Sequence, residues 1–328
     1  MRAWFTASTG VRLGEKDTPA PGAGELLVRV LACGVCRTDL HVVDRELPEH
    51  RTGVVPGHQV VGVVEALGTG TVSATVGELV GIAWLHRTCG ACRWCRSGRE
   101  NLCPYAVFTG WDVDGGFAEF VTVPEAFAYP LPPEADPVAL APLLCAGIIG
   151  YRALQRAELP SGGHLGIYGF GSSGHLTAQL ALAAGARVSA MTRGEQNRAL
   201  ARRLGLDFVG EAMDAPPQPL DSAIVFAPAG ELVPAALSAT APGGTVVLAG
   251  IHMSDIPAMN YDAHLFRERD LRTVTANTRS DGDAFLRLAT RLALTPTVTR
   301  YGFGDTARAL DELRRGDASG SLVIDFGL

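Results

Sequence analysis

Short apolar runs dominate the first half of the chain, and glycine and proline separate them. The clearest runs are "ELLVRVLAC" (25–33), "QVVGVVEAL" (59–67), "ELVGIAW" (78–84) and "FAEFVTV" (117–123). Runs of this length, rich in valine and bounded by turn residues, are typical of β-strands. Several short strands at such spacing predict an antiparallel, barrel-like β domain.

The pattern changes near Pro142, where strand-like runs begin to alternate with helical ones. "HLGIYGF" predicts a strand and "HLTAQLALAAG" a helix; "ARVSAMT" and "EQNRALARRLG" repeat the pair. Further buried strands are predicted at "DSAIVFA", "GTVVLAG" and "DLRTVTA", and beyond residue 278 a helix at "GDAFLRLATRLAL" and a strand at "GSLVIDF". Such alternation predicts a parallel sheet covered by helices.

Composition narrows the function classes. A chain of 328 residues, 47% hydrophobic and 19% charged, has material for two well-packed domains. The net charge of -6 weighs against nucleic acid as a partner, because phosphate binding needs a basic surface. Neither a signal peptide nor a membrane span is recognised, so we expect a soluble, cytoplasmic protein without a membrane partner. Seven cysteines then favour metal or thiol chemistry over disulfides.

Four cysteines lie close together in "CGACRWCRSGRENLC". Cys89, Cys92, Cys95 and Cys103 follow the spacing C-x2-C-x2-C-x7-C. Four thiolates can close a tetrahedral zinc site that has no open position, so this zinc would organise a loop and bind no substrate. Four unrelated buried thiols are one alternative. A zinc ribbon that binds nucleic acid is another, which the nearby arginines allow and the acidic chain disfavours.

Three other residues form a candidate open metal site. Cys36 lies in "ACGVCRTDLH", His58 in "PGHQVVG" and Cys145 in "APLLCAGIIGYRAL". Two thiolates and one imidazole leave a fourth position for water or substrate, as in catalytic zinc sites. Taken singly, each residue could belong to a core. Cys33 and Cys36 could also form a C-x-x-C redox pair, although the βαβ context of that motif is missing.

A glycine-rich loop follows the first strand of the second half. Gly169, Gly171 and Gly174 form G-x-G-x-x-G between a predicted strand and a predicted helix, which is the context of a dinucleotide-binding loop. The glycines permit a tight turn and let the backbone approach a pyrophosphate at the helix N-terminus. A glycine-rich turn without a ligand is the alternative.

The end of the next strand bears on cofactor choice. NAD sites usually end this strand with an acid that binds the ribose hydroxyls. Here Thr192 and Arg193 stand in that place, and no acid appears before Glu195. A hydroxyl and a guanidinium suit a 2′-phosphate, so the sequence predicts a preference for NADP(H). If Arg193 is only a solvated loop residue, NAD(H) can still bind.

The motifs "GVCRTDLH", "PGHQVVG", the four-cysteine loop and "GFGSSG" occur in an order that resembles the zinc-dependent medium-chain alcohol dehydrogenases, nearly end to end. The branch grouped with cinnamyl-alcohol-type dehydrogenases is the most similar. The resemblance implies a GroES-like β-barrel catalytic domain (1–145 and 279–328) with an inserted Rossmann domain (146–278). It also implies two zinc ions per chain and a homodimer or homotetramer.

The resemblance also implies roles for individual residues. Cys36, His58 and Cys145 would bind the catalytic zinc, and the four clustered cysteines the structural zinc. Arg37 would contact the cofactor pyrophosphate. Thr38 and His41 would form a proton relay, and Asp39 would orient the ligand histidine. Thr38 and Asp39 could instead simply cap a helix, and a partly exposed His41 needs no role.

Two positions depart from the family pattern. Relatives usually carry His-Glu where this chain has His58-Gln59, which leaves the open site less negative. We hypothesise that Gln59 changes the pKa of bound alcohol without abolishing catalysis. Many relatives carry a cofactor-contacting arginine near the C-terminus, where this chain has Ser321. That contact is therefore in doubt.

The resulting prediction is an oxidoreductase that transfers hydride between NADP(H) and a primary alcohol or aldehyde, aromatic or medium-chain. Trp84, Leu85 and Trp111 fall near the pocket-lining stretches of relatives and would favour such substrates, although core or interface roles are as natural for them. A polyol or amino-alcohol dehydrogenase of the same fold is one alternative. A non-catalytic zinc- and dinucleotide-binding redox sensor is another.

Overall fold

The computed structural model describes residues 1–327, which fall into two compact units. The first comprises Met1–Cys145, Ala276–Leu286 and the chain from Thr297 onward; the second comprises Ala146–Thr275 and Arg287–Pro296. The end of the second unit differs from the expected boundary at residue 278. Residues Ala276–Leu286 belong to the first unit, and Arg287–Pro296 belong again to the second. Hydrogen bonds explain the difference, since Asn277 donates to the Tyr129 hydroxyl (3.3 Å) in the first unit, whereas Gln179 and Thr295 bond to each other in the second.

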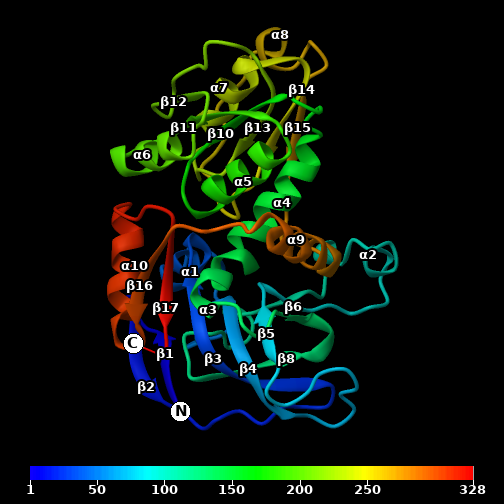
Figure 1. The fold of residues 1–328 in the computed structure, drawn as a ribbon, viewed down its shortest axis with the longest axis vertical. Coiled ribbons are helices and arrows are strands. Elements are labelled where there is room, and N and C mark those ends of the chain that lie inside the picture. Colours follow the sequence, from blue (N-terminus) through cyan, green and yellow to red (C-terminus); the bar gives the residue numbers. More distant parts are fainter. Residues whose placement is uncertain (328) are drawn as a thin grey trace. The chain divides into compact units, whose positions relative to one another are not determined.

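The first unit is built on a mostly antiparallel seven-stranded sheet (Figure 1). Its order is β16-β17-β3-β4-β5-β9, and β8 also pairs with β3. The bounds of these strands are β3 Glu25–Val35, β4 Gln59–Leu67, β5 Leu79–Ile82, β8 Phe120–Pro124, β9 Ala128–Pro130, β16 Val298–Gly302 and β17 Ser321–Asp325. Two short antiparallel pairs complete the unit: β1 Arg2–Thr6 with β2 Val11–Glu15, and β6 Leu85–Arg87 with β7 Val107–Phe108.

Strands β3 and β4 form the centre of this unit. Residues Val60, Val61 and Val64 of β4 are at most 1% exposed, so this strand is apolar on both faces. A side chain at Gly62 would lie 2.4 Å from the Arg29 carbonyl oxygen, so the close approach of the two strands requires glycine there. This rigid pair ends at the residues that carry the candidate metal ligands.

The second unit contains a six-stranded parallel sheet in the order β12-β11-β10-β13-β14-β15 (Figure 1). The bounds are β10 His164–Tyr168, β11 Arg187–Met191, β12 Phe208–Gly210, β13 Leu220–Val225, β14 Thr240–Leu248 and β15 Asp270–Thr273. This is the doubly wound Rossmann order, with its switch point between β10 and β13. The predicted parallel sheet is therefore confirmed, and ligands of such sheets bind at the carboxyl ends of the strands beside the switch point.

Helices cover both faces of the parallel sheet. Ala153 and Ala157 of α4 (Ala146–Ala157), Ala178 and Ala181 of α5 (Ser172–Ala183) and Leu200 of α6 (Glu195–Arg203) pack on one face. Helix α7 (Leu232–Ala239) packs on the other face through Leu232, Val233, Ala236 and Leu237. Small alanine side chains allow α4 and α5 to lie close to the sheet and to each other.

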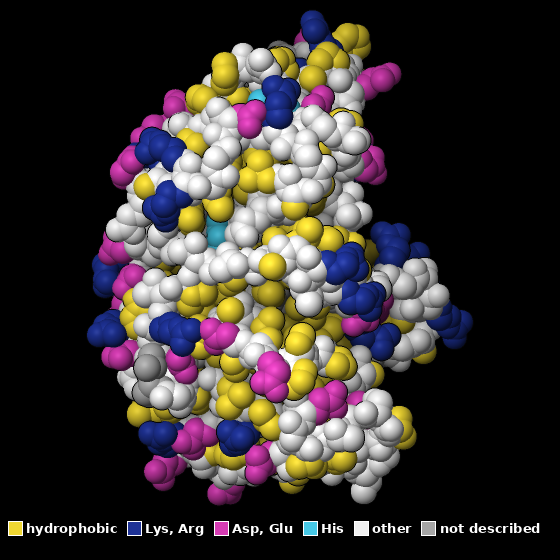
Figure 2. Space-filling view, in the orientation of Figure 1, with side chains coloured by type: hydrophobic (Ala, Val, Ile, Leu, Met, Phe, Trp, Pro, Cys, Tyr) yellow, Lys and Arg dark blue, Asp and Glu magenta, His cyan; other side chains and the backbone are white. Residues whose placement is uncertain are grey.

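The remaining helices are mostly short. They are α1 Arg37–Val43, α2 Arg93–Arg96, α3 Pro137–Leu140, α8 Tyr261–His264, α9 Arg279–Leu292 and α10 Thr306–Arg315. Among residues 1–327, no single helix is long and apolar enough to cross a membrane; only the bent pair Pro137–Leu144 and Ala146–Ala157, taken together, meets that test of length and composition. Figure 2 shows basic and acidic side chains interspersed over the face that it draws.

Candidate metal and cofactor sites

The structure brings Cys36, His58 and Cys145 together. Their ligand atoms all lie within 4.8 Å of one another, and Cys36 Sγ is 3.2 Å from His58 Nε2. Cys36 follows β3, His58 immediately precedes β4, and Cys145 follows the 3₁₀ turn Ala141–Leu144. His58 is buried and the two cysteines are half-buried, so the three ligand atoms meet at the edge of the first unit's core.

Asp39 holds two of these ligands in place. Cys36 is the N-cap of α1: its sulfur accepts the Thr38 N–H at 3.3 Å, and its own N–H donates to Asp39 Oδ2 at 2.8 Å. The other oxygen of Asp39 accepts His58 Nδ1–H at 2.9 Å and the Gly57 N–H at 3.1 Å. Asp39 therefore caps α1 and also bonds to Nδ1 of His58, which leaves Nε2 as the ring nitrogen that a metal could bind.

Burial and charge push the pKa values of this cluster apart. The hydrogen bond from Cys145 holds the pKa of Cys36 well below its usual value, and the same bond raises the pKa of Cys145. Burial alone would lower the pKa of His58, but the charges of Cys36 and Asp39 raise it well above the ordinary value. Burial raises the pKa of Asp39. Among these groups only Cys36 has its pKa lowered, which favours the thiolate that metal binding needs.

The donor set fits zinc with an open position. Two sulfurs and one imidazole nitrogen are ligands that zinc accepts, and three protein ligands leave a fourth position for a small molecule. The buried carboxylate behind His58 is the outer partner expected of such a site. No rearrangement of the backbone is needed, because the three ligand atoms already share one small volume.

The four clustered cysteines form a second, closed group. Tetrahedral zinc with Zn–S bonds of about 2.3 Å places sulfurs about 3.8 Å apart. The observed Sγ–Sγ separations are 3.5 Å for Cys92–Cys95 and for Cys103–Cys89, and 3.9 Å for Cys89–Cys95. Backbone N–H groups of Ala91 and Cys92 lower the pKa of Cys89 to about 6, which favours the thiolate that metal binding needs. The geometry therefore fits a structural zinc.

Two arginines near this cluster have a local aromatic partner. The guanidinium groups of Arg93 and Arg99 lie 4.3 and 4.8 Å from the ring centroid of Trp94. Glu100 is buried at 6% exposure, and its Oε1 accepts the backbone N–H of Arg279 at 3.0 Å. The loop is thus joined to the start of α9, and two of its arginines, Arg93 and Arg99, stabilise it through cation–π contacts with Trp94.

The glycine-rich loop has the geometry that a pyrophosphate requires. Gly169 has φ +95°, and a Cβ there would lie 2.8 Å from the Ala227 nitrogen. A Cβ at Gly174 would lie 2.5 Å from the Gly169 carbonyl oxygen, whereas one at Gly171 would meet no atom within 4 Å. Gly171 is the N-cap of α5 and supplies no side-chain cap, and helix N-termini of this kind are common anion-binding sites. In a dinucleotide-binding loop the first glycine permits the tight turn, the second lets the backbone approach the pyrophosphate, and the third allows close packing of helix and strand. Gly169, Gly171 and Gly174 fit these three requirements in that order.

Thr192 and Arg193 occupy different environments. Thr192 is buried at 4% exposure, and its hydroxyl oxygen accepts the Phe170 N–H at 3.1 Å, so it fixes the glycine-rich loop. Arg193 is exposed at the end of β11. Sequence reasoning missed Arg198, which bonds to the Thr192 carbonyl (3.3 Å), Glu195 (3.1 Å) and Glu211 (2.7 Å). Its spacing of three residues from Glu195 on α6 was the available signal.

The predicted relay residues lie on one helix. Thr38 and His41 are three positions apart on α1, which places them on neighbouring parts of its surface. His41 is 5% exposed, and its Nδ1 bonds to the Glu46 carboxylate, a partner that the sequence did not reveal. Arg37, at the start of the same helix, is exposed.

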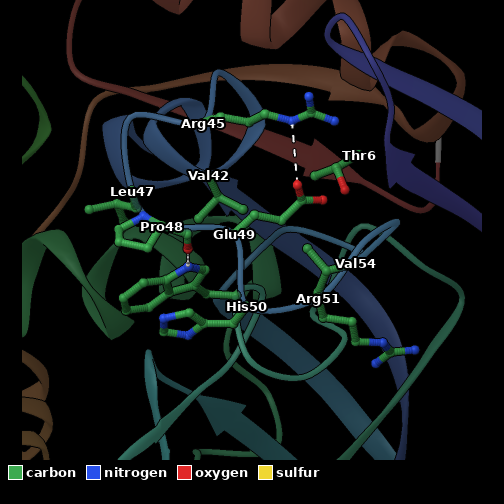
Figure 3. Close-up of a pocket in the computed structure, with 10 residues that line it drawn as sticks. Thr6, Val42, Arg45, Leu47, Pro48, Glu49, His50, Arg51 and Val54 are labelled. Carbon is green, nitrogen blue, oxygen red and sulfur yellow. Dashed lines mark hydrogen bonds and ion pairs between the residues drawn. The ribbon is translucent and has the colours of Figure 1, made fainter.

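Aromatic rings lie beside the open site. The Trp84 ring is 6.4 Å from that of His58 and stacks on Phe108 at 4.1 Å and on Trp111 at 6.1 Å. His50 stacks on Trp111 at 4.2 Å, and Figure 3 shows it in the loop that lines an adjacent pocket. Sequence reasoning missed both Phe108 and His50.

Three further predicted positions are buried. Leu85, expected near substrate, is 3% exposed and packs in the core of the first unit. Gln59 is 2% exposed, pairs with Gly34 across β4 and β3, and leaves no room for a side chain at Gly34, where a Cβ would lie 2.8 Å from Gln59 Cδ. Ser321 is 3% exposed in β17.

Comparison with protein families matches both halves of the chain. Residues 22–133 match the alcohol dehydrogenase GroES-like domain, and residues 174–291 match the zinc-binding dehydrogenase family. Together with the parallel sheet, these matches confirm the predicted fold class, a GroES-like domain combined with a Rossmann domain.

Individual proteins that are similar to this chain point to the same family. The chain is 54% identical over 311 residues to the probable alcohol dehydrogenase AdhA of Mycobacterium tuberculosis, covering 93% of this chain and 90% of the relative. A cinnamyl alcohol dehydrogenase from Sorghum bicolor superimposes with a TM-score of 0.90 at 29% identity, covering 99% and 97% of the two chains. An acetophenone reductase from Geotrichum candidum in complex with NAD has a TM-score of 0.89 at 27% identity, covering 99% and 96%.

Proposed function

The chain belongs to the zinc-dependent medium-chain alcohol dehydrogenase family, and we propose that it uses NADP(H) to interconvert primary alcohols and aldehydes, preferably aromatic or medium-chain ones. The observation that carries the proposal is the convergence of Cys36, His58 and Cys145 within 4.8 Å, with the Asp39 carboxylate on the far side of His58. Three protein ligands with an open position are the arrangement of a catalytic zinc, whereas the four-cysteine group has none to offer.

Different residues of the open site would bind the metal, orient its ligands and carry the proton. Zinc held there would act as a Lewis acid on the substrate oxygen. Cys36 and Cys145 supply thiolate ligands, and Asp39 keeps His58 in the tautomer whose Nε2 faces the metal position. Thr38 begins the proton path, and its backbone N–H donates to Cys36 Sγ at 3.3 Å, so the residue adjoins this metal ligand. His41, buried on the same helix, receives the proton from this path.

Cofactor binding rests on the second unit. The glycine-rich loop and the start of α5 would hold the pyrophosphate, and the nicotinamide would supply or accept the hydride. Arg193, exposed at the end of β11, supports NADP(H), because a guanidinium can bind the 2′-phosphate. Since the similar acetophenone reductase holds NAD, the preference rests on the residues of this chain and needs its own measurement.

The substrate preference rests on the rings beside His58. Trp84, Phe108 and Trp111 form one contiguous aromatic surface, with ring centroids between 4.1 and 6.1 Å apart. A flat apolar surface next to the reacting position favours aromatic or extended apolar aldehydes over hydrophilic polyols, because it desolvates their apolar surface without offering many hydrogen bonds.

The test is consumption of NADPH and of NADH by the purified, zinc-loaded protein with benzaldehyde, cinnamaldehyde, hexanal and a sugar aldehyde. We expect turnover with the first three, at least tenfold higher kcat/KM for NADPH than for NADH, and little turnover of the sugar. Preference for NADH would reject the cofactor assignment alone. Absence of turnover with every aldehyde and both cofactors, in protein carrying zinc, would reject the proposed reaction.

A further inference from the structure

Lys16 is the only lysine in the chain, so the protein has a single side-chain amine. It follows β2 directly, and its side chain is 27% exposed, which leaves part of it accessible to small solutes. The amino group of Met1 is the second primary amine, and it donates to the Lys16 carbonyl at 2.7 Å. The arginines do not add to this set, because a guanidinium stays protonated and is no nucleophile.

The ammonium group of Lys16 forms an ion pair with Asp114. Its Nζ donates to Oδ2 of this carboxylate, and the Asp114 side chain is 21% exposed. Nη1 of Arg51, a residue that Figure 3 labels, lies 3.4 Å from the other oxygen, Oδ1. Two cations thus share one carboxylate, and Nζ is held as a hydrogen-bond donor.

Asp114 also holds the backbone around it. Its Oδ1 accepts the Val55 N–H at 3.1 Å, and the Gly115 N–H donates to the Val55 carbonyl at 2.7 Å. An asparagine at position 114 can keep the first of these bonds through its amide oxygen, but its NH₂ group cannot accept from an ammonium. The substitution Asp114→Asn therefore removes the ion pair and retains the local backbone structure.

Aldehydes condense with primary amines. A neutral amine attacks the carbonyl carbon, a C–N bond forms, and the carbonyl oxygen leaves as water, which gives an imine. This reaction needs the lone pair of a neutral Nζ, whereas the ion pair with Asp114 needs the ammonium. Lys16 can therefore react only after it has left Asp114 and has passed one proton to water.

We propose that Lys16 is the one side chain of the protein that aldehyde substrates convert to an imine, and that its ion pair with Asp114 limits this modification. The proposal rests on the proposed function, in which the enzyme works in the presence of aldehydes. Each event consumes one aldehyde and the Lys16 ammonium, and it yields a neutral imine, one water and one proton. A single, ion-paired lysine thus keeps the side reaction small.

The test measures trapped adducts in the zinc-loaded protein without cofactor, so that no aldehyde is turned over. The protein is incubated with hexanal and sodium cyanoborohydride, whose hydride reduces the imine to a stable secondary amine. Peptide mass spectrometry then quantifies the adducts at Lys16 and at the N-terminus. We expect Asp114→Asn to raise the rate at Lys16 about fivefold, the size expected for loss of a partly exposed ion pair. The rate at the N-terminus should change less than twofold.

Two further variants are the controls. Asp17→Asn removes a carboxylate that is exposed and adjacent to Lys16 in the sequence, and it leaves the pair with Asp114 in place. This variant should change the rate at Lys16 less than twofold. Lys16→Arg keeps the positive charge and should leave the N-terminal amine as the only position that carries an adduct.

Three results would overturn the proposal. These are equal rates at Lys16 in the wild type and in Asp114→Asn, an equal increase in Asp17→Asn, or a side-chain adduct that persists in Lys16→Arg. A wild-type enzyme that reduces no aldehyde when cofactor is supplied would instead reject the proposed function. The adduct measurement needs no turnover, so it would still decide whether Asp114 protects Lys16.

Discussion

Nδ1 of His58 donates a hydrogen bond to Oδ1 of Asp39 across 2.9 Å, and both side chains are at most 2% exposed. The same carboxylate accepts the N–H groups of Cys36 and Gly57, so one side chain joins a helix start, a strand start and two of the three open-site ligands. A single residue thus sets both the local fold and the orientation of the ligands.

Asp39→Asn should weaken the open site without unfolding the protein. The amide oxygen can still accept from His58 and Gly57, but the NH₂ group cannot accept from Cys36 and the negative charge is lost. We expect the affinity for metal or kcat/KM to fall about 10- to 100-fold, the range found when outer partners of metal ligands are changed. Competition with a zinc chelator measures the affinity. Asp44→Asn, which changes a carboxylate at the other end of α1, should leave it unchanged, and equal effects of the two variants would contradict the role of Asp39.

Gln59→Glu should move the pH profile of alcohol oxidation to higher pH. Gln59 is 2% exposed and follows His58 directly. A carboxylate there adds negative charge to the site and disfavours loss of a proton from bound alcohol. The measurement is kcat between pH 6 and 10. Gln218→Glu, on the surface of the second unit, makes the same charge change and should not move the profile. Superimposable profiles for Gln59→Glu and the wild type would reject the hypothesis.

Arg193→Ala should discriminate between the two cofactors. If the guanidinium binds the 2′-phosphate, its loss removes a charge-assisted contact that NADH cannot make. We expect KM for NADPH to rise about tenfold and KM for NADH to change less than twofold. Arg202→Ala, which removes an exposed arginine paired with Glu195, is the control. Similar increases for both cofactors would reject the contact.

His86 should make the fold sensitive to acid. Burial lowers the pKa of His86 to about 4, below its value near 6.5 in the unfolded chain. Between these values the unfolded chain binds the proton, so stability is full above pH 6.5 and falls as the pH decreases towards 4, by on the order of 3 kcal/mol. Urea unfolding from pH 7 to pH 4 should show a smaller loss in His86→Leu than in the wild type. An identical loss in both proteins would contradict the assignment.

Much of the fold could be predicted because its determinants are local. The apolar run 59–67 coincides with β4, and the alternation after Pro142 gave the parallel sheet. Cysteine spacing likewise predicted the closed group, since its four members lie within fifteen residues. The carboxyl-terminal boundary of the second unit could not be predicted, because it depends on tertiary contacts such as that between Asn277 and Tyr129.

The residues of the candidate site could be predicted from the sequence only in part, for the same reason. The positions of Cys36, His58 and Cys145 followed from their motifs and the family resemblance. The partner of His41 could not be predicted from a motif, because Glu46 contacts His41 only through the left-handed turn at Arg45. The Thr192 hydroxyl also accepts the Phe170 N–H, a contact between two loops that no pattern in the sequence reveals, and its predicted role at the cofactor stays a prediction.

The most direct test of the account is metal content measured together with turnover in Cys145→Ala. Cys145 belongs to the open group, whereas Cys33 is buried and belongs to neither group, so Cys33→Ala is the matched control. The account predicts two zinc ions per chain and full aldehyde reduction in the wild type and in Cys33→Ala. Cys145→Ala should retain one zinc ion and lose at least 99% of the turnover. Two zinc ions and wild-type turnover in Cys145→Ala would contradict the claim that the open site is the catalytic metal centre.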